Sequence, residues 1–263
     1  MRDGTALECV MAGTGAARRR IAVRVRDGAG PAIVWLGGFR SDMGATKAMA
    51  VDAWAASAGR RFVRFDYSGH GASEGDFSAC TISTWLEDAQ AVLAAHAADA
   101  PVLIGSSMGG WIACLAARAL AGSGGGAPTR LVLIAPALDF TEDLMWDRFP
   151  PEVRARLEQD GVWHRQSAYA PEPDAITMAL IEDGRRNRLL AGPLDLGCPV
   201  HILQGMKDPD VPHAHAFRIL ERLPAAGTVL TLIADGDHRL SRPQDIARLL
   251  SAVAEMADPL SAG

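Results

Sequence analysis

Short apolar runs alternate along the chain with longer segments in which apolar residues recur every three or four positions. The longer segments predict helices over residues 44–58, 81–97, 108–121, 212–223 and 243–256. The short runs predict strands over residues 21–25, 32–36, 61–65, 101–105, 131–135, 200–204 and 228–233. Several of these runs are apolar on both faces, which is typical of strands covered by helices on both sides. The alternation predicts an α/β fold with a mostly parallel central sheet flanked by helices.

One long segment interrupts this alternation. Between residues 138 and 195 the strand signal is absent, and short helical patterns are separated by prolines and glycines. We therefore predict a helical cap over residues 138–195, inserted into a core that residues 1–137 and 196–263 form together.

Composition narrows the classes of partner. The chain has 263 residues, of which 49% are hydrophobic and 22% charged, and these values fit a globular protein with one large domain. A net charge of −5 offers no attraction for a polyanion, so we expect a small-molecule partner and no nucleic acid. No stretch approaches the roughly 18 apolar residues that span a bilayer. The N-terminal residues lack the apolar core of a secretory signal, and we expect a cytoplasmic protein.

The spacing of the cysteines and histidines matches no metal-binding motif. Four widely separated cysteines form no C-x-x-C pair, and the seven histidines follow no metal-binding pattern. We expect no disulfide framework, no metal and no organic cofactor. The sequence has no signature of an oligomeric state.

The segment Gly105-Ser106-Ser107-Met108-Gly109 matches the pattern G-x-S-x-G between a predicted strand and a predicted helix. A strand that turns sharply into a helix strains the serine backbone, and the flanking glycines remove Cβ atoms that would collide there. The helix also offers free N–H groups where an oxyanion would develop. We predict that Ser107 is a nucleophile. The alternative is an ordinary hydroxyl in a glycine-rich turn, and Ser106 has the wrong glycine register.

A serine nucleophile needs a base and an acid, which in one known arrangement follow it in the order Asp or Glu, then His. Asp208 follows the sixth predicted strand, at the sheet edge where α/β proteins build their sites. Asp210 is the alternative acid, and it is also suited to stabilising the turn. His238 follows the seventh predicted strand and is the predicted base, because His213 and His215 fall within a predicted helix.

An oxyanion hole needs a second N–H donor besides the residue after the nucleophile. The turn Gly37-Gly38-Phe39-Arg40 follows the second predicted strand and is able to approach the serine closely. We predict that the N–H groups of Phe39 and Met108 form the hole, and that Gly38 contacts substrate.

The predicted cap carries bulky apolar side chains that suit an acyl pocket or, equally, the core of the cap itself. They are Met145, Trp146, Phe149, Trp163 and Tyr169. Of these we assign Trp146 and Trp163 to substrate binding. A cluster of cap arginines suits an anionic leaving group, although a solvated helix face is the favoured interpretation. It comprises Arg185, Arg186 and Arg188.

Several motifs outside the serine turn also match one known family. The chain resembles the α/β-hydrolase superfamily, and within it the abhydrolase branch that includes mitochondrial palmitoyl-protein thioesterase, also described as an acyl-glucuronide esterase. The matching stretches are "GATKA", "RFDYSGHGASEG", "GSSMGGW", "GVW", "GMKDPDVP" and "DHR". The resemblance implies the α/β-hydrolase fold, and it places nucleophile, acid and base on Ser107, Asp208 and His238 and the oxyanion donors on Phe39 and Met108. The Ala, Arg and Gly bias is typical of a bacterial relative.

These residues predict a serine esterase or thioesterase that cleaves carboxylic esters or thioesters through an acyl-enzyme. The substrate is a small molecule or an S-acylated protein. Two alternatives are a peptidase or C–C hydrolase on the same triad, and a non-catalytic protein that binds small molecules. Retention of all three triad residues argues against the non-catalytic alternative.

Overall fold

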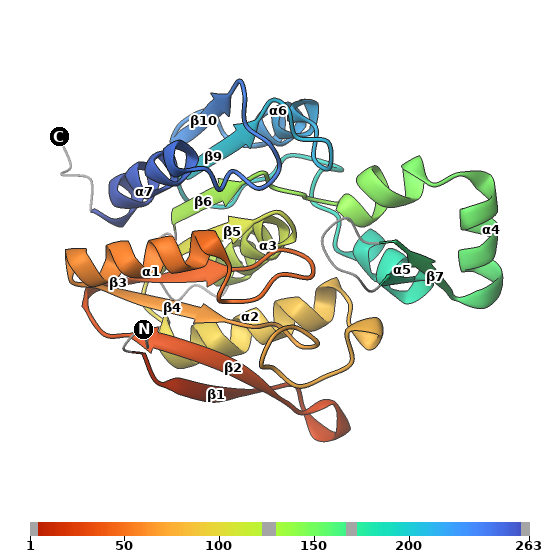
Figure 1. The fold of residues 1–263 in the computed structure, drawn as a ribbon, viewed down its shortest axis with the longest axis horizontal. Coiled ribbons are helices and arrows are strands. Elements are labelled where there is room, and N and C mark those ends of the chain that lie inside the picture. Colours follow the sequence, from red (N-terminus) through yellow and green to blue (C-terminus); the bar gives the residue numbers. More distant parts are fainter. Residues whose placement is uncertain (1–4, 123–129, 167–172, 259–263) are drawn as a thin grey trace.

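The computed structural model describes residues 5–122, 130–166 and 173–258, which form a central sheet with helices on both faces and a cap at one end (Figure 1). The sheet has eight strands in the order β1-β2-β4-β3-β5-β6-β9-β10. Strands β2 and β4 pair antiparallel, as do β1 and β2, whereas every pair from β4 to β10 is parallel. The strands are β1 Leu7–Ala12, β2 Arg19–Arg26, β3 Ala29–Leu36, β4 Arg60–Phe65, β5 Val102–Ser106, β6 Arg130–Ile134, β9 Val200–Gly205 and β10 Thr228–Ile233.

The predicted α/β architecture is confirmed, with one strand more than the sequence pattern indicated. Strand β1 was not expected, because its side chains are mostly exposed and it carries no alternation of apolar and polar residues. It lies at the edge of the sheet, where strands need no apolar face on both sides.

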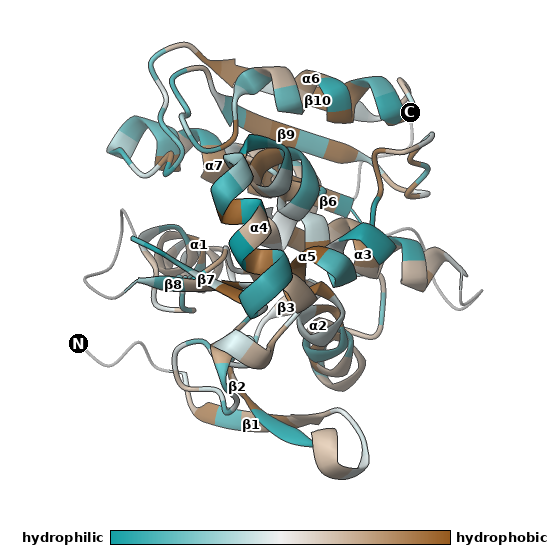
Figure 2. Ribbon diagram, turned by 90° about the vertical axis from the view of Figure 1, so that its right-hand side faces the viewer, coloured by the Kyte–Doolittle hydropathy of each residue, from teal (hydrophilic) through white to brown (hydrophobic). Residues whose placement is uncertain are grey.

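The helices form two layers on opposite sides of the sheet (Figure 2). Helices α1 and α7 contact each other and cover one face, while α2 and α3 contact each other and cover the other face. The core helices are α1 Thr46–Ala58, α2 Ile82–His96, α3 Met108–Gly122, α6 His213–Arg222 and α7 Pro243–Ala257, with single 3-10 turns at Gly15–Ala17 and Phe77–Ala79.

Strand β3 shows why the two layers form. Ile33 and Trp35 belong to the apolar cluster under α1 and α7. Val34 and Leu36 belong to the larger cluster under α2 and α3. Successive side chains of a strand point to opposite faces, so a run that is apolar throughout needs a helical layer on each side.

The cap follows β6 and lies beyond one end of the sheet, at the right of Figure 1. Its elements are a π-helical turn at Thr141–Met145, a 3-10 turn at Trp146–Arg148, α4 Pro151–Asp160, β7 Val162–Arg165, β8 Asp174–Thr177 and α5 Met178–Arg186. The cap contains the helices that the sequence predicted, and also two strands that it did not, since β7 and β8 pair antiparallel as a small sheet of their own. Each of these strands has four residues, too few for period-two alternation to stand out.

Buried carboxylates attach the cap to the core. Asp139 accepts hydrogen bonds from the N–H groups of Leu189 and Leu190, so it joins the two chain segments at the neck of the cap. Asp183 on α5 accepts from both the N–H and the hydroxyl of Ser83 on α2. A hydrogen bond to a charged partner is strong and directional, so these contacts fix the position of the cap.

Two further expectations concern the whole chain. No helix within the described ranges is both long enough and apolar enough to cross a membrane. All four cysteines are free thiols, of which Cys80 and Cys114 are buried and Cys9 is exposed.

Candidate active site

Ser107 stands at a tight turn between the end of β5 and the start of α3. Its φ of 55° lies in the left-handed region, which non-glycine residues rarely adopt. The turn is possible because its glycines allow backbone to approach backbone: a Cβ on Gly109 would lie 2.1 Å from the carbonyl oxygen of Leu36, and one on Gly105 would lie 2.4 Å from the carbonyl oxygen of Gly109. The conformation expected of a strained serine at this position is therefore present.

Hydrogen bonds hold this turn against the neighbouring strand. The Ser107 N–H donates to the carbonyl of Ile134 at 2.9 Å, and the Ser107 carbonyl accepts from Gly110 at 2.9 Å and Ala137 at 3.1 Å. Both backbone groups of Ser107 are thus used, and its side chain faces the pocket described below. A strained residue persists only when its surroundings fix it in this way.

His238 and Asp208 come from the loops after β10 and β9, and their side chains meet. His238 Nδ1 lies 2.8 Å from Asp208 Oδ2. The other Asp208 oxygen accepts from the N–H groups of Asp210 and Val211 at 2.9 and 2.8 Å, and the Asp208 side chain is fully buried. A carboxylate held in this manner orients the imidazole, fixes Nδ1 as the protonated nitrogen and leaves Nε2 free to act as a base.

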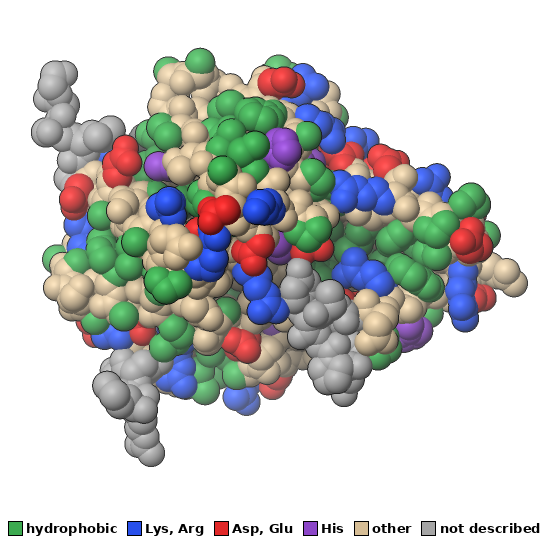
Figure 3. Space-filling view, turned by 45° about the horizontal axis from the view of Figure 1, so that its top comes forward, with side chains coloured by type: hydrophobic (Ala, Val, Ile, Leu, Met, Phe, Trp, Pro, Cys, Tyr) green, Lys and Arg blue, Asp and Glu red, His purple; other side chains and the backbone are tan. Residues whose placement is uncertain are grey.

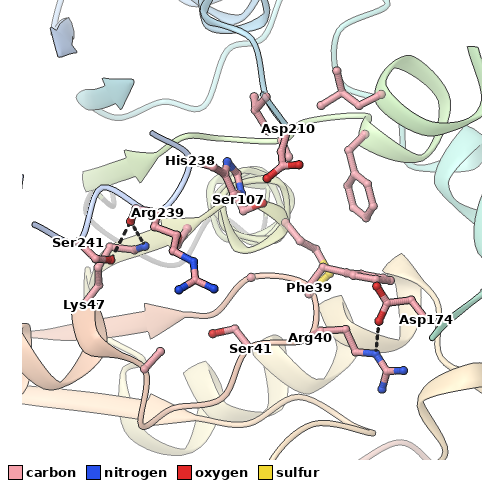
Figure 4. Close-up of a pocket in the computed structure, with 18 of the residues that line it drawn as sticks. Phe39, Arg40, Ser41, Lys47, Ser107, Asp174, Asp210, His238, Arg239 and Ser241 are labelled. Atoms are coloured by element: carbon pink, nitrogen blue, oxygen red, sulfur yellow. Dashed lines mark hydrogen bonds and ion pairs between the residues drawn. The ribbon is translucent and has the colours of Figure 1, made fainter. Parts of the chain in front are cut away.

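Asp210, the alternative acid, has its side chain at the wall of the pocket (Figure 4). Ligand atoms of Asp208, Asp210 and His238 lie within 4.8 Å of one another, and they form the one such group in the described part of the chain. Because both Asp208 oxygens and His238 Nδ1 are already engaged in hydrogen bonds, this group is poorly suited to a metal ion.

The turn after β3 brings a second set of backbone groups to the serine. A Cβ on Gly38 would lie 3.4 Å from the Ser107 Cβ, so this turn runs directly beside the nucleophile candidate. The Phe39 ring packs edge-on against Phe77 and Phe140, with ring centroids 4.9 and 5.8 Å apart. Packing on both sides fixes Phe39, while Met108 begins α3 with its N–H free of any helical partner.

Arg40 extends the same turn and connects it to two other parts of the molecule. Its φ is 61°, and its N–H donates to His70 Nε2 at 3.1 Å. Its guanidinium forms an ion pair with the buried carboxylate of Asp174 in the cap, with 2.8 Å between Nε and Oδ1, and stacks over the ring of Phe77. The turn beside Ser107 is therefore bound both to the core and to the cap.

His70 is neutral where it meets this turn. Burial lowers its pKa from 6.5 to about 4. Its Nδ1 lies 3.1 Å from the carbonyl of Ser68, which makes Nδ1 the donor and leaves Nε2 as the acceptor for Arg40. His70 therefore supports the turn beside Ser107 through its contact with the Arg40 N–H.

Ser107, His238, Phe39 and Met108 line one cavity of about 680 Å³ between core and cap, whereas Asp208 reaches it only through His238. Apolar side chains in its lining include Phe39, Met108, Ala137, Phe140, Leu144 and Met145. Charged side chains in its lining include Arg40, Asp42, Lys47, Arg148, Arg165, Asp174, Asp210 and Arg239. Acidic and basic side chains are interspersed over the middle of this face, and hydrophobic ones gather toward the cap (Figure 3). The cavity suits a substrate with an apolar part and a polar part.

Two expected substrate contacts lie elsewhere. Trp146 and Trp163 are not among the described residues that line this cavity. The Arg185 guanidinium stacks on Trp146 at 4.7 Å, and Trp163 packs against Phe149 at 5.2 Å. Both indoles thus serve the internal packing of the cap, which corrects the expectation, whereas Gly38 and Met145 do line the cavity. Tyr169 lies outside the described residues.

The cap arginines also have partners within the protein. Arg185 pairs with Glu142 at 2.7 Å, and Arg186 pairs with Asp183 at 2.9 Å. Arg188 lies 3.4 Å from Asp143. Their charges stabilise the cap and its neck, in line with the interpretation that did not assign them to substrate.

Sequence reasoning missed Lys47 and Arg239, which line the cavity on the side away from the cap (Figure 4). Lys47 lies within the motif "GATKA" and Arg239 within "DHR", but neither residue had been assigned a role. Their position at the carboxyl edge of parallel strands was the available signal.

With this geometry in view, the chain can be compared with known proteins. A sequence model described as "Alpha/beta hydrolase family" matches residues 16–249. The chain belongs to the α/β-hydrolase family.

Relatives within this family cover most of the chain. The bovine protein named "Palmitoyl-protein thioesterase ABHD10, mitochondrial" is 31% identical over 237 residues, which make up 89% of this chain and 75% of that protein. A solved structure from Agrobacterium vitis S4 is 50% identical and superposes with a TM-score of 0.93, covering 97% of this chain and 99% of that one. Mouse alpha/beta hydrolase domain-containing protein 10 is 30% identical with a TM-score of 0.85, covering 97% and 100%.

These comparisons confirm the resemblance and the fold that the sequence indicated. They support a hydrolase whose curated homologues are named as thioesterases. The curated relatives are named as mitochondrial proteins, so the expected cytoplasmic location of this chain stays a prediction.

Proposed function

We propose that this α/β-hydrolase is a serine hydrolase that cleaves carboxylic esters or thioesters through an acyl-enzyme on Ser107. The observation that carries the proposal is the left-handed Ser107 in a cavity shared with His238, whose Nδ1 lies 2.8 Å from the buried Asp208. A nucleophile, a base and a residue that orients the base are the minimal set for acyl transfer.

In the first half-reaction, His238 Nε2 accepts the Ser107 proton as Oγ attacks the acyl carbonyl. The N–H groups of Phe39 and Met108 stabilise the oxyanion, and Asp208 stabilises the positive imidazolium. The tetrahedral intermediate collapses, the bond to the alcohol or thiol breaks, and His238 gives its proton to the leaving group. The acyl group is then bound to Ser107 as an ester.

In the second half-reaction, His238 accepts a proton from water while the water oxygen attacks the acyl-enzyme. Collapse of this intermediate returns the proton to Ser107 and releases the carboxylic acid. Every proton in this cycle moves through His238, so the mechanism uses no metal and no organic cofactor.

The substrate class follows from the two kinds of side chain that line the cavity. The apolar side chains of Phe39, Phe140, Leu144 and Met145 suit the acyl chain, and the charged ones suit a polar alcohol or thiol leaving group. Relatives named as palmitoyl-protein thioesterases favour an S-acylated protein or peptide, and a small-molecule ester is the other member of the class.

The test measures kcat/KM for one acyl group presented as an S-acyl cysteine peptide and as an oxygen ester, with Ser107→Ala as the blank. We expect hydrolysis of at least one, lost by about 10⁶-fold in kcat in the variant. A fluorophosphonate probe should label Ser107 in the folded protein. Absence of both labelling and turnover would instead favour a non-catalytic binding protein of the same fold.

A further inference from the structure

Lys47 lies in the first turn of α1 and reaches across the cavity wall to the loop that carries His238. Its Nζ donates a hydrogen bond to the carbonyl of Arg239, the residue that follows His238. The Ser241 hydroxyl donates to the same carbonyl at 2.9 Å (Figure 4). One carbonyl next to the candidate base therefore receives two side-chain donors, one of them from a helix 192 positions away in the chain.

The loop that receives these bonds is strained. Leu240 has a φ of 45°, a left-handed conformation that a branched side chain rarely adopts. Its N–H is held at 2.9 Å by Asp237 Oδ1. A backbone in this conformation persists only if contacts fix it, so the His238 loop depends on side chains such as those of Lys47 and Asp237.

The position of Lys47 is unfavourable for a positive charge. It lies at the N-terminus of α1, where the helix dipole is positive, and the first turn of this helix contains no acidic residue. Burial lowers the pKa of Lys47 from 10.5 to about 8, and the carboxylates of Asp237 and Asp208 offset only part of this effect. A charge that the fold disfavours, beside a candidate catalytic base, fits a functional role better than a stabilising one.

We propose that Lys47 is a positioning residue for the base: in its charged form it fixes the His238 loop through the Arg239 carbonyl, so that the imidazole faces Ser107. This inference rests on the proposed serine hydrolase function. Lys47 acts through His238 and takes no part in bond making or breaking.

Several charged groups surround Lys47 and shape its titration. Asp237 and Arg239 lie on the loop that it binds, Asp208 lies on the loop after β9, and Asp42 lines the same cavity from the turn after β3. When pH rises through about 8, Lys47 becomes a neutral amine and its bond to the carbonyl weakens. We therefore expect kcat to fall above pH 8.

This loss of kcat is not a loss of stability. Because the folded pKa lies below the unfolded value, the unfolded chain binds more protons between about pH 8 and 10.5. The contribution of Lys47 to stability therefore rises with pH over this window. A decrease of kcat above pH 8 that accompanies unchanged or greater resistance to denaturant is the specific signature of the proposal.

The experiment compares wild type with Lys47→Met and Lys47→Arg, from pH 6 to 10, on whichever ester or thioester the wild type hydrolyses. Methionine keeps the length of the side chain and removes the charge, and we expect kcat at pH 7 to fall by about tenfold to 100-fold with KM nearly unchanged. Arginine stays charged throughout and should recover kcat and abolish the fall above pH 8. The matched control is Lys207→Met, an exposed lysine on the loop of Asp208, which should leave the profile intact.

Fluorophosphonate labelling of Ser107 and denaturant unfolding accompany each kinetic measurement. Equal kcat values for Lys47→Met and wild type, with the same pH profile, would overturn the inference while the hydrolase function stands. Absence of labelling and turnover in the wild type would overturn the function itself. If Lys47→Met does not fold, a wild-type kcat that stays constant from pH 7 to 9.5 still overturns the inference, and a fall that arginine abolishes supports it.

Discussion

The core wall and the cap wall of the cavity are built by different means. On the core side, Ser107 and its neighbours are positioned by backbone against backbone, and a Cβ added to Gly109 would lie 2.1 Å from the Leu36 carbonyl oxygen. On the cap side, position depends on three carboxylates: Asp139 at the neck, Asp183 of α5 bound to α2, and Asp174 bound to Arg40.

This difference indicates that substitutions are tolerated less well on the core side than on the cap side. Backbone contacts leave no space for even one methyl group, so the core wall is fixed to within a fraction of an ångström. Charged hydrogen bonds set the position of the cap, but solvent near the partly exposed Arg40 and Arg165 weakens their ion pairs with Asp174. We therefore expect the chemical step to depend on residues of the core wall, and the preference among substrates to depend on residues of the cap.

The largest effect should come from the acid on the core wall. Asp208→Asn keeps the shape of the side chain but favours the wrong imidazole tautomer, and we expect kcat to fall by about 10⁴-fold. Asp210→Asn, two residues away on the same loop, is the matched control, and it should lower kcat far less. Steady-state kinetics at pH 7.5 separates them, and an equal loss in both would mean that the acid has been misassigned.

Backbone contact at the serine turn provides the next test. Gly109→Ala forces a Cβ into the Leu36 and Gly37 carbonyls, and we expect the free energy of unfolding to fall by about 4 kcal/mol. Gly122→Ala, at the other end of the same helix, meets no atom within 4 Å and should leave stability unchanged or slightly raised. Urea denaturation of both variants measures this contrast, and a Gly109→Ala protein of normal stability would contradict it.

Acid should destabilise the protein through His70, which binds the turn that carries Phe39. Since burial lowers the pKa of His70 from 6.5 to about 4, the unfolded chain binds the proton more tightly, and stability falls as pH decreases from 6.5 to 4. The full effect is about 3 kcal/mol.

The measurement is the free energy of unfolding at pH 7 and pH 4.5. His70→Gln should reduce the difference between the two pH values, because glutamine does not titrate. His164→Gln, which changes an exposed cap histidine, should retain the wild-type difference. A His70→Gln protein with the wild-type pH dependence would show that other groups cause it.

The smallest effect should come from the contact between the two walls. Asp174→Asn removes the charge shared by Arg40 and Arg165, which costs about 1 kcal/mol because both arginines are partly exposed. We expect kcat/KM to fall about fivefold for long acyl chains and less for an acetyl ester. Asp160→Asn breaks an exposed ion pair within α4 and should change neither ratio.

Local patterns in the sequence predicted most of the elements that form the core wall. Apolar runs predicted seven strands of the main sheet, and the glycines around Ser107 predicted a strained turn between β5 and α3. They succeeded because burial on two faces and tight turns restrict which residue types a position accepts. Strand β1 and the pair β7–β8 were missed because short or exposed strands place no such restriction on their residues.

The sequence by itself determined the α/β architecture, the order of Ser107, Asp208 and His238 along the chain, and the glycines that make the serine turn possible. Only the tertiary structure showed that the Asp208 and His238 side chains meet, that Trp146 and Trp163 pack inside the cap, and that Lys47 reaches the Arg239 carbonyl. The physical reason is the distance in sequence between the residues that make each contact. A turn or a strand is specified by neighbouring residues, whereas a contact between side chains up to 192 positions apart exists only after the sheet has brought their loops together.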